Sequence, residues 1–174
     1  HLCPKQFETK GRVLYVMRNP KDCLVSLHYM RGVPTDGWPG SFSRFTNPKT
    51  PNAFGSYWDH VKATEPFMAS VGKRGLVVFY ENLHTDFDGE VARVASLLGT
   101  SLTEAKLAKL KDLTHISNMR KMNTLTVRKG KTGGWRTHFS EEQATFFDGL
   151  YERYGLGDSE FYRQMLQAVD RADR

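Results

Sequence analysis

The sequence predicts an α/β fold in which helices cover both faces of a parallel sheet. Two short apolar runs, residues 13–17 and 76–80, are rich in β-branched and aromatic residues, as buried strands are. Neither run alternates with polar residues, which is typical of parallel strands covered on both faces. Helical patterns lie between and after the two runs, so the chain is expected to alternate strands with helices.

The first strand leads directly into a helix. Asn19 is a common helix N-cap, Pro20 suits the first helical position, and Asp22 lies in the electropositive first turn. We therefore expect a helix N-terminus at the carboxyl end of this strand.

Three further helices are predicted from apolar residues at helical spacing, at 56–71, 87–98 and 101–113. Pro66 predicts a kink in the first of these, or two helices that meet near Glu65. Gly99 is expected to end the second helix. Ser101 and Glu104 have the spacing of a capping box at the start of the third.

The remaining chain contains one more helix start and two long loops. Ser140, followed by acidic residues, marks a helix near the C-terminus. Residues 32–51 and 120–134, which are rich in glycine and polar residues, are predicted to be loops.

Length and composition predict one globular domain over residues 1–174. The chain has 39% apolar residues and a formal net charge of +6. Cys3 and Cys23 match neither a disulfide framework nor a zinc site, which favours a reducing, cytoplasmic location. No apolar run reaches the roughly 20 residues of a membrane-spanning helix. Because the chain begins at His1 rather than Met, we expect a domain that is incomplete at its N-terminus.

The strand-to-helix junction is the first candidate binding site. Free N–H groups at a helix N-terminus attract anions, Arg18 adds a planar cationic fork, and Ser26 adds a hydroxyl two turns later. The alternative is that Arg18 forms a surface ion pair and that Ser26 is an ordinary surface serine.

A second cationic cluster lies between residues 128 and 135. Arg128 and Lys129 precede Gly130, and two further glycines follow, so that the backbone can approach a phosphate closely. The spacing is not that of a Walker A loop. The alternative is a solvated basic turn.

Other chemistry has weaker support. Tyr80, at the end of the second predicted strand, is placed to contact a ligand or to act as a core aromatic. The six histidines lack metal-ligand spacing. Aromatic and basic residues do not interleave along a strand, which argues against a nucleic-acid surface.

In this order, these segments resemble the cytosolic sulfotransferase family, whose members transfer a sulfuryl group from 3′-phosphoadenosine 5′-phosphosulfate (PAPS). The resemblance covers residues 1 to about 151. It implies that the 3′-phosphate is held by Arg18, Ser26, Arg128, Lys129 and Gly130.

The resemblance assigns further roles. Tyr80, Thr114 and Met119 match residues that contact the nucleotide, whereas Ile116 stands where the family has an aromatic residue that stacks on adenine. His1 matches the catalytic general base, which takes the proton of the acceptor.

The resemblance also implies a P-loop-kinase-like fold whose N-terminal strand and phosphosulfate loop are missing here, so that this chain alone is expected to be inactive. The implied acceptor is a small phenol, alcohol, steroid or amine, and no metal, nucleic acid or membrane is required. The family's dimer motif is matched only loosely, by Arg136, Ser140, Glu141 and Thr145, and the resemblance leaves a homodimer open.

Three alternatives stay open. A nucleotide kinase-like phosphotransferase needs a Walker A loop, which this sequence lacks. A non-catalytic nucleotide- or nucleic-acid-binding module fits the positive charge and the absence of catalytic lysines. A membrane-anchored carbohydrate sulfotransferase needs an anchor and luminal cysteines.

Overall fold

The computed structural model describes residues 10–30, 34–47, 49, 55–122 and 130–174. His1, Arg128 and Lys129, for which the sequence predicted roles, lie outside the described residues.

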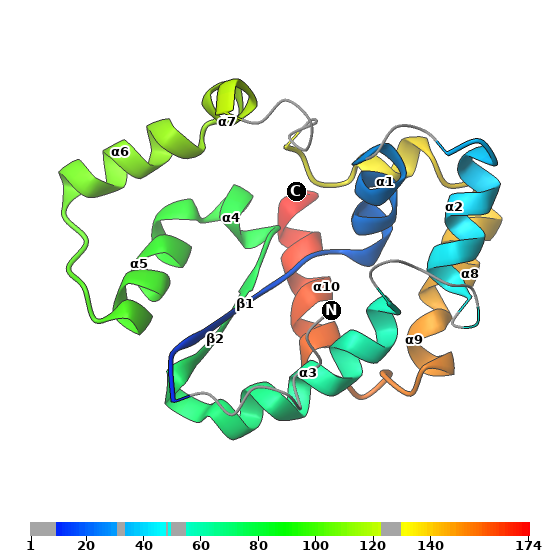
Figure 1. Ribbon diagram of the computed structural model, residues 1–174, viewed down its shortest axis with the longest axis horizontal. Coiled ribbons are helices and arrows are strands. Elements are labelled where there is room, and N and C mark those ends of the chain that lie inside the picture. Colours follow the sequence, from blue (N-terminus) through cyan, green and yellow to red (C-terminus); the bar gives the residue numbers. More distant parts are fainter. Residues whose placement is uncertain (1–9, 31–33, 48, 50–54, 123–129) are drawn as a thin grey trace.

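The described residues contain a sheet of two parallel strands, β1 (Val13–Met17) and β2 (Gly75–Phe79), as Figure 1 shows. The register pairs Val13 with Gly75 and Met17 with Phe79. The predicted parallel pair is confirmed, with the second strand one residue earlier than expected. Tyr80 therefore lies just beyond β2, where its N–H donates to the carbonyl of Met17 at 2.8 Å.

Between the strands, the described residues form three α-helices: α1 (Pro20–Met30), α2 (Gly37–Thr46) and α3 (Tyr57–Val71). The prediction of a loop across residues 32–51 is wrong, because α2 occupies its middle. Pro39 lies in the first turn of α2, where its missing N–H costs no helical hydrogen bond, and Phe42 and Phe45 pack against the core.

The third helix runs unbroken through Pro66, so the alternative of two separate helices is wrong. Ser56 caps its N-terminus and accepts the N–H of Asp59 at 3.2 Å. Buried residues on both sides of the proline, among them Val61 and Met68, anchor the helix where one hydrogen bond is lost.

After β2 the chain forms α4 (Asn82–Thr85), α5 (Phe87–Leu98), α6 (Glu104–Thr114) and α7 (Ile116–Met122). Gly99 ends α5 with a φ of +67°, as predicted. The predicted capping box at Ser101 is wrong, because Thr103 caps α6 by accepting the N–H of Lys106 at 3.3 Å. No residue of α6 is buried, so its leucine stripe does not face the core.

The described C-terminal part contains a 3₁₀ turn (Gly134–Thr137) and the helices α8 (Glu141–Asp148), α9 (Leu150–Arg153) and α10 (Glu160–Ala172). The predicted helix start at Ser140 is confirmed, with a capping box that Gln143 completes. Within the predicted loop 120–134, residues 120–122 end α7 and 123–129 are not described.

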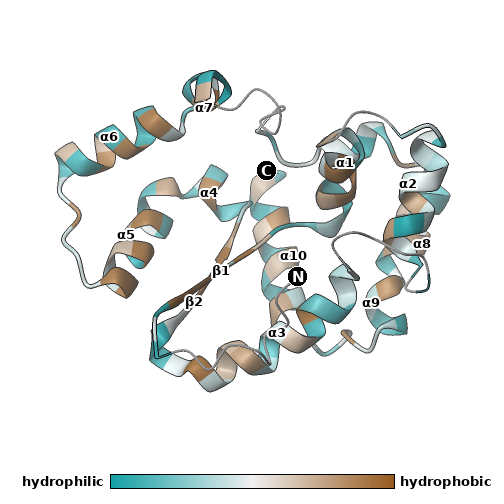
Figure 2. Cartoon of the chain, viewed as in Figure 1, coloured by the Kyte–Doolittle hydropathy of each residue, from teal (hydrophilic) through white to brown (hydrophobic). Residues whose placement is uncertain are grey.

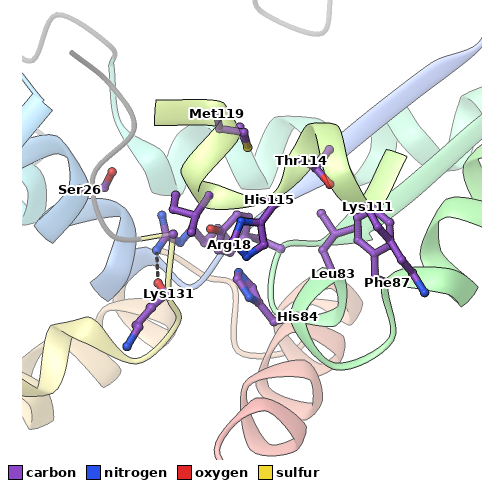
Figure 3. A pocket seen from close by; sticks show the side chains of 13 residues that line it. Arg18, Ser26, Leu83, His84, Phe87, Lys111, Thr114, His115, Met119 and Lys131 are labelled. Carbon is purple, nitrogen blue, oxygen red and sulfur yellow. Dashed lines mark hydrogen bonds between the residues drawn. The ribbon is translucent and has the colours of Figure 1, made fainter. Parts of the chain in front are cut away.

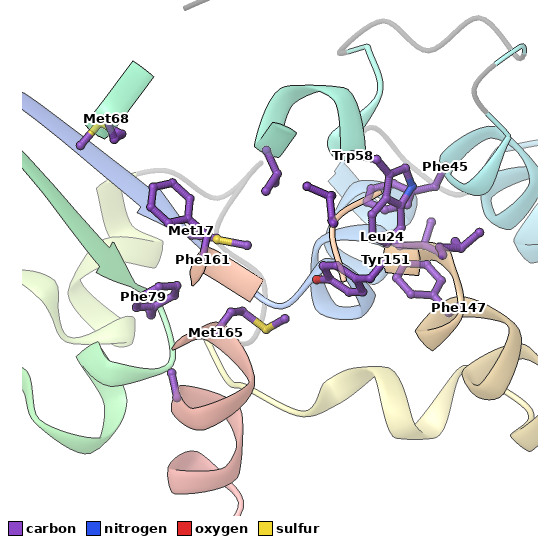
Figure 4. Close-up of a cluster of buried hydrophobic side chains, with 14 residues drawn as sticks. Met17, Leu24, Phe45, Trp58, Met68, Phe79, Phe147, Tyr151, Phe161 and Met165 are labelled. Carbon is purple, nitrogen blue, oxygen red and sulfur yellow. The ribbon is translucent and has the colours of Figure 1, made fainter. Parts of the chain in front are cut away.

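The core lies between one face of the sheet and helices α1, α2, α3, α8, α9 and α10 (Figure 4). Trp58 is fully buried at its centre, with ring centroids 5.4 Å from Phe147 and 5.0 Å from Tyr151. On β1, Tyr15 contacts Phe161 of α10. This packing fixes α1 relative to the sheet, and so positions the junction between β1 and α1.

The other face of the sheet is covered unevenly. Val78 of β2 is 2% exposed, whereas Val16, its register partner on β1, is 53% exposed. Leu14 is exposed on the same face. Figure 2 shows that both strands are nevertheless hydrophobic. The expected coverage of both faces is thus found at β2, while β1 is open on one side in the described structure.

Candidate functional site

The site begins where β1 passes into α1. The Asn19 side chain accepts the N–H of Lys21 at 2.9 Å, and its carbonyl accepts the N–H of Cys23 at 3.0 Å. Asn19 therefore caps α1, as the sequence predicted. The N–H of Asn19 itself donates to Glu81 Oε1 at 2.9 Å, which joins the ends of the two strands.

Sequence reasoning gave Glu81 no role, although it directly follows the second strand. Its side chain is 1% exposed, and Oε2 has no hydrogen-bond partner in the described structure. Burial raises the pKa of this carboxyl above its ordinary value, while the hydrogen bond from Asn19 partly opposes the shift.

Arg18 brings the two predicted cationic segments together. Its Nη2 donates to the carbonyl of Lys131 at 3.0 Å (Figure 3), and its guanidinium carbon lies 4.4 Å from the ring centroid of Tyr80. Among the described residues Arg18 forms no ion pair, so the surface ion-pair alternative has no support. The end of β1, the end of β2 and residues 130–135, which we call the glycine-rich turn, thus meet at one place.

Asp22 connects α1 to this turn. From the sequence, we expected only that its negative charge would lie in the first turn of the helix. Its Oδ2 accepts the N–H of Gly133 at 2.8 Å, and its Oδ1 accepts the N–H of Trp135 at 3.0 Å. Next to it, Lys21 Nζ lies 4.3 Å from the ring centroid of Trp135 and forms an ion pair with Asp148 at 2.7 Å.

A pocket of about 730 Å³ opens beside Arg18. It is lined by all of the predicted nucleotide-site residues that the structure describes, namely Arg18, Ser26, Tyr80, Thr114, Met119 and Gly130. They come from the β1–α1 junction, α1, the end of β2, α6, α7 and the glycine-rich turn, yet they line one cavity. Figure 3 shows Arg18, Ser26, Thr114 and Met119 in the wall of this pocket. Their roles in binding stay a prediction.

The glycine-rich turn requires glycine at position 130, both for its backbone conformation and because no room is left for a side chain. Gly130 has a φ of +61°, which disfavours any residue with a Cβ. A Cβ there would lie 2.6 Å from Cδ1 of Ile116. The turn therefore packs tightly against the start of α7, on the wall of the pocket.

Two histidines in the pocket wall were not singled out from the sequence. The His84 ring lies 4.9 Å from that of Tyr80, in an edge-on arrangement. Burial and the positive charge of Arg18 lower the pKa of His84 below its ordinary value. His115 Nδ1 is 2.8 Å from Ser117 Oγ, at the start of α7. In the sequence, the two histidines lie close to Tyr80 and Thr114, which were predicted to contact the nucleotide. A single histidine forms no motif, so neither could be assigned a role from its spacing.

In the part of the chain that the structure describes, no group of three or more His, Cys, Asp or Glu side chains is placed to hold a metal ion. None of the helices in that part is both long and apolar enough to cross a membrane.

Comparison with known proteins identifies the family. The family model of the sulfotransferase domain matches residues 1–167. The chain therefore belongs to the sulfotransferase family, as its motifs predicted.

Individual relatives agree with this assignment. The chain is 31% identical to sulfotransferase 1C2 of Homo sapiens over 91% of its length, and 34% identical to cytosolic sulfotransferase 1 of Danio rerio over 87%. It covers 59% and 56% of these relatives, so it spans less than two thirds of their length.

A solved structure matches the fold. The crystal structure of mouse sulfotransferase SULT7A1 complexed with PAP superposes with a TM-score of 0.81 at 27% identity. The match covers 92% of this chain and 63% of that one. The α/β fold predicted from the sequence is therefore confirmed.

Proposed function

We propose that this protein transfers a sulfuryl group from PAPS to a hydroxyl or amine of a small acceptor. The observation that carries the proposal is the contact of Arg18 with Lys131 at the edge of a pocket that Ser26, Tyr80 and Gly130 also line. Further support comes from the family and from the mouse relative, which was solved with PAP, adenosine 3′,5′-bisphosphate.

In this proposal the 3′-phosphate lies beside Arg18 and Ser26. Arg128, Lys129 and the backbone at Gly130 complete the phosphate site. Charge-assisted hydrogen bonds to phosphate contribute on the order of 1.5–3 kcal/mol each, so these groups dominate donor binding.

The nucleoside is assigned to Tyr80, Thr114 and Met119. The Thr114 hydroxyl donates to the carbonyl of Leu110 at 2.7 Å, so its oxygen still has an acceptor lone pair for a ligand. PAPS supplies an activated sulfuryl group, and sulfuryl transfer depends mainly on alignment and on neutralising the charge of the leaving oxygens. His1 is proposed as the general base that takes the proton of the acceptor.

The remaining proposals concern the whole protein. Residues 1–174 are assigned to one sulfotransferase domain that continues beyond this chain. The Danio rerio relative is named a cytosolic sulfotransferase, which supports a cytoplasmic location. A phenol, alcohol, steroid or amine remains the proposed acceptor.

The test is a titration of the chain with adenosine 3′,5′-bisphosphate and with 5′-AMP, which lacks the 3′-phosphate. Arg18→Ala is expected to weaken binding of the bisphosphate by roughly tenfold to a hundredfold while changing 5′-AMP binding little. Arg153→Ala is a matched control, because the Arg153 guanidinium also lies over an aromatic ring. Its guanidinium carbon is 4.7 Å from the ring centroid of Phe146.

Equal losses for both nucleotides in Arg18→Ala would contradict the assigned role. ATP and a short oligonucleotide complete the comparison. Tighter binding of ATP would favour the kinase-like alternative, and tighter binding of the oligonucleotide would favour the nucleic-acid-binding module.

A further inference from the structure

Asp22 occupies an unusual place for a carboxylate. It is the third residue of α1 and is 3% exposed, and both of its oxygens accept N–H groups from a segment more than 100 residues away. The two donors, Gly133 and Trp135, flank Gly134 in the glycine-rich turn. Asp22 is therefore a bridge between α1 and this turn.

Placing a carboxylate at this position costs free energy, for two reasons. A buried carboxylate close to an anion site repels the anion, and burial of an ionised group is itself unfavourable. The α1 N-terminus and the two N–H donors offset these costs. Because Asp22 does not line the pocket, its charge is directed at the turn rather than at a ligand.

The turn reaches the pocket only two residues before the first of these contacts. Lys131, whose carbonyl accepts from Arg18, and Gly130 both line the cavity. Gly133 has a φ of +71°, so the backbone turns sharply between the two N–H groups that Asp22 accepts. Fixing Gly133 and Trp135 therefore fixes the position of the Lys131 carbonyl.

We propose that Asp22 is a positioning residue that holds the glycine-rich turn where it completes the nucleotide pocket. This inference rests on the proposed function, because it concerns the same pocket. Lys21 adds a second contact between α1 and the turn, since its ammonium group lies against the Trp135 ring. Asp22 acts through the backbone of the turn and does not touch the nucleotide.

The test compares Asp22→Asn with Asp59→Asn in the full chain. Asparagine keeps the size of the side chain, but one oxygen becomes an NH₂ group that cannot accept an N–H. Asp59 is a matched control, because it is also the third residue of a helix, α3, and is exposed.

Amide hydrogen exchange in the absence of nucleotide is measured first. Asp22→Asn is expected to speed exchange at Gly133 and Trp135 by about tenfold or more, because one partly buried hydrogen bond is lost, while Val78 in β2 keeps its protection. Unchanged exchange at Gly133 and Trp135 would overturn the proposal, and so would an equal increase at Val78, which would indicate general destabilisation.

Binding is the second measurement. Asp22→Asn is expected to weaken adenosine 3′,5′-bisphosphate about tenfold and 5′-AMP much less, whereas Asp59→Asn changes neither. Equal weakening of both nucleotides would overturn the positioning role. If the unaltered chain binds neither nucleotide, the proposed function fails, and the exchange measurement still decides whether Asp22 holds the turn.

Discussion

The guanidinium of Arg18 donates to the carbonyl of Lys131 at 3.0 Å, although 113 residues separate the two. This bond uses one edge of the guanidinium. The Arg18 Nε atom is buried and has no partner within the described structure. A buried donor without a partner costs free energy, so a ligand oxygen that accepts from it would bind favourably.

Gly130→Ala is expected to weaken nucleotide binding. The new Cβ would lie 2.6 Å from Cδ1 of Ile116, and a φ of +61° is strained for alanine. Either the turn or the Ile116 side chain, which also lines the pocket, must then shift. We expect a loss of roughly tenfold in affinity for adenosine 3′,5′-bisphosphate, measured by calorimetry.

Gly155→Ala is the control for backbone strain. Gly155 has a φ of +68°, and a Cβ there would meet only Lys62 Nζ, at 3.4 Å. Both variants should lower the melting temperature, Gly130→Ala by more because of its added clash, but Gly155→Ala should leave the affinity unchanged. A similar fall in affinity in both variants would show that Gly130 matters only for stability.

The binding of an anionic nucleotide should depend on pH through His84. Burial and the positive charge of Arg18 lower the pKa of His84 below 6.5, so the imidazole is mostly neutral at pH 7 before a nucleotide binds. A phosphate beside Arg18 would oppose that positive charge and raise the pKa of His84. Binding is then linked to proton uptake, and affinity should rise as the pH falls from 7 to 6.

His84→Gln should remove this part of the pH dependence, with calorimetric titrations at pH 8, 7 and 6 as the measurement. Arg18, Lys111, His115 and Lys131 also line the pocket and stay in place in the variant, so the difference isolates His84. Identical pH profiles of the two proteins would contradict the prediction. The stability of the nucleotide-free protein should change in the opposite direction. The pKa of His84 is lower in the folded protein than in the unfolded chain, so the unfolded chain binds the proton more tightly. His84 therefore lowers the free energy of unfolding as the pH falls below about 6.5.

The sequence predicted those parts of the molecule that local patterns specify. Residues 13–17 have the continuous apolar character of a strand, and Asn19-Pro20 has the character of a helix start, so both were found. The helix at 37–46 was missed because its glycines and proline indicate a turn, while its stability comes from packing of Phe42 and Phe45 against distant residues.

Of the site, the sequence predicted the residues that carry charge or lie in recognisable motifs. Arg18, Tyr80 and Gly130 line the pocket together. The contacts of Asp22 and Glu81 were not predictable, because they join backbone N–H groups of segments far apart in the chain, and no spacing rule describes such pairs. These contacts exist only once the fold brings the segments together.

Glu81→Gln should change the pH dependence of stability. Burial raises the pKa of Glu81 in the folded protein, so the folded state holds its proton more tightly than the unfolded chain. Its contribution to stability is present below about pH 4.5 and is lost as the pH rises through the folded pKa. Glutamine stays neutral, and its oxygen still accepts from Asn19.

Urea unfolding at pH 7.5, 6 and 5 measures this effect. The parent should gain more stability than Glu81→Gln as the pH falls, because only the parent carries this titrating group. Glu142→Gln, an exposed position in the first turn of α8, should behave like the parent. If the parent and Glu81→Gln gain stability equally, the Glu81 carboxyl titrates alike in the folded and unfolded states.

A valine pair across the strands tests how the sheet is covered. Val16 and Val78 are register partners on one face, yet they are 53% and 2% exposed. Valine to threonine replaces a methyl group by a hydroxyl of similar size, which is costly only where water cannot reach it.

Val78→Thr should therefore lower the free energy of unfolding by about 1–3 kcal/mol, and Val16→Thr by less than about 0.5 kcal/mol. Urea unfolding of the chain measures both. Equal losses would mean that the face of β1 is covered in solution, by further protein or by a second copy, and that the hydrophobic residues Leu14 and Val16 are part of a buried contact.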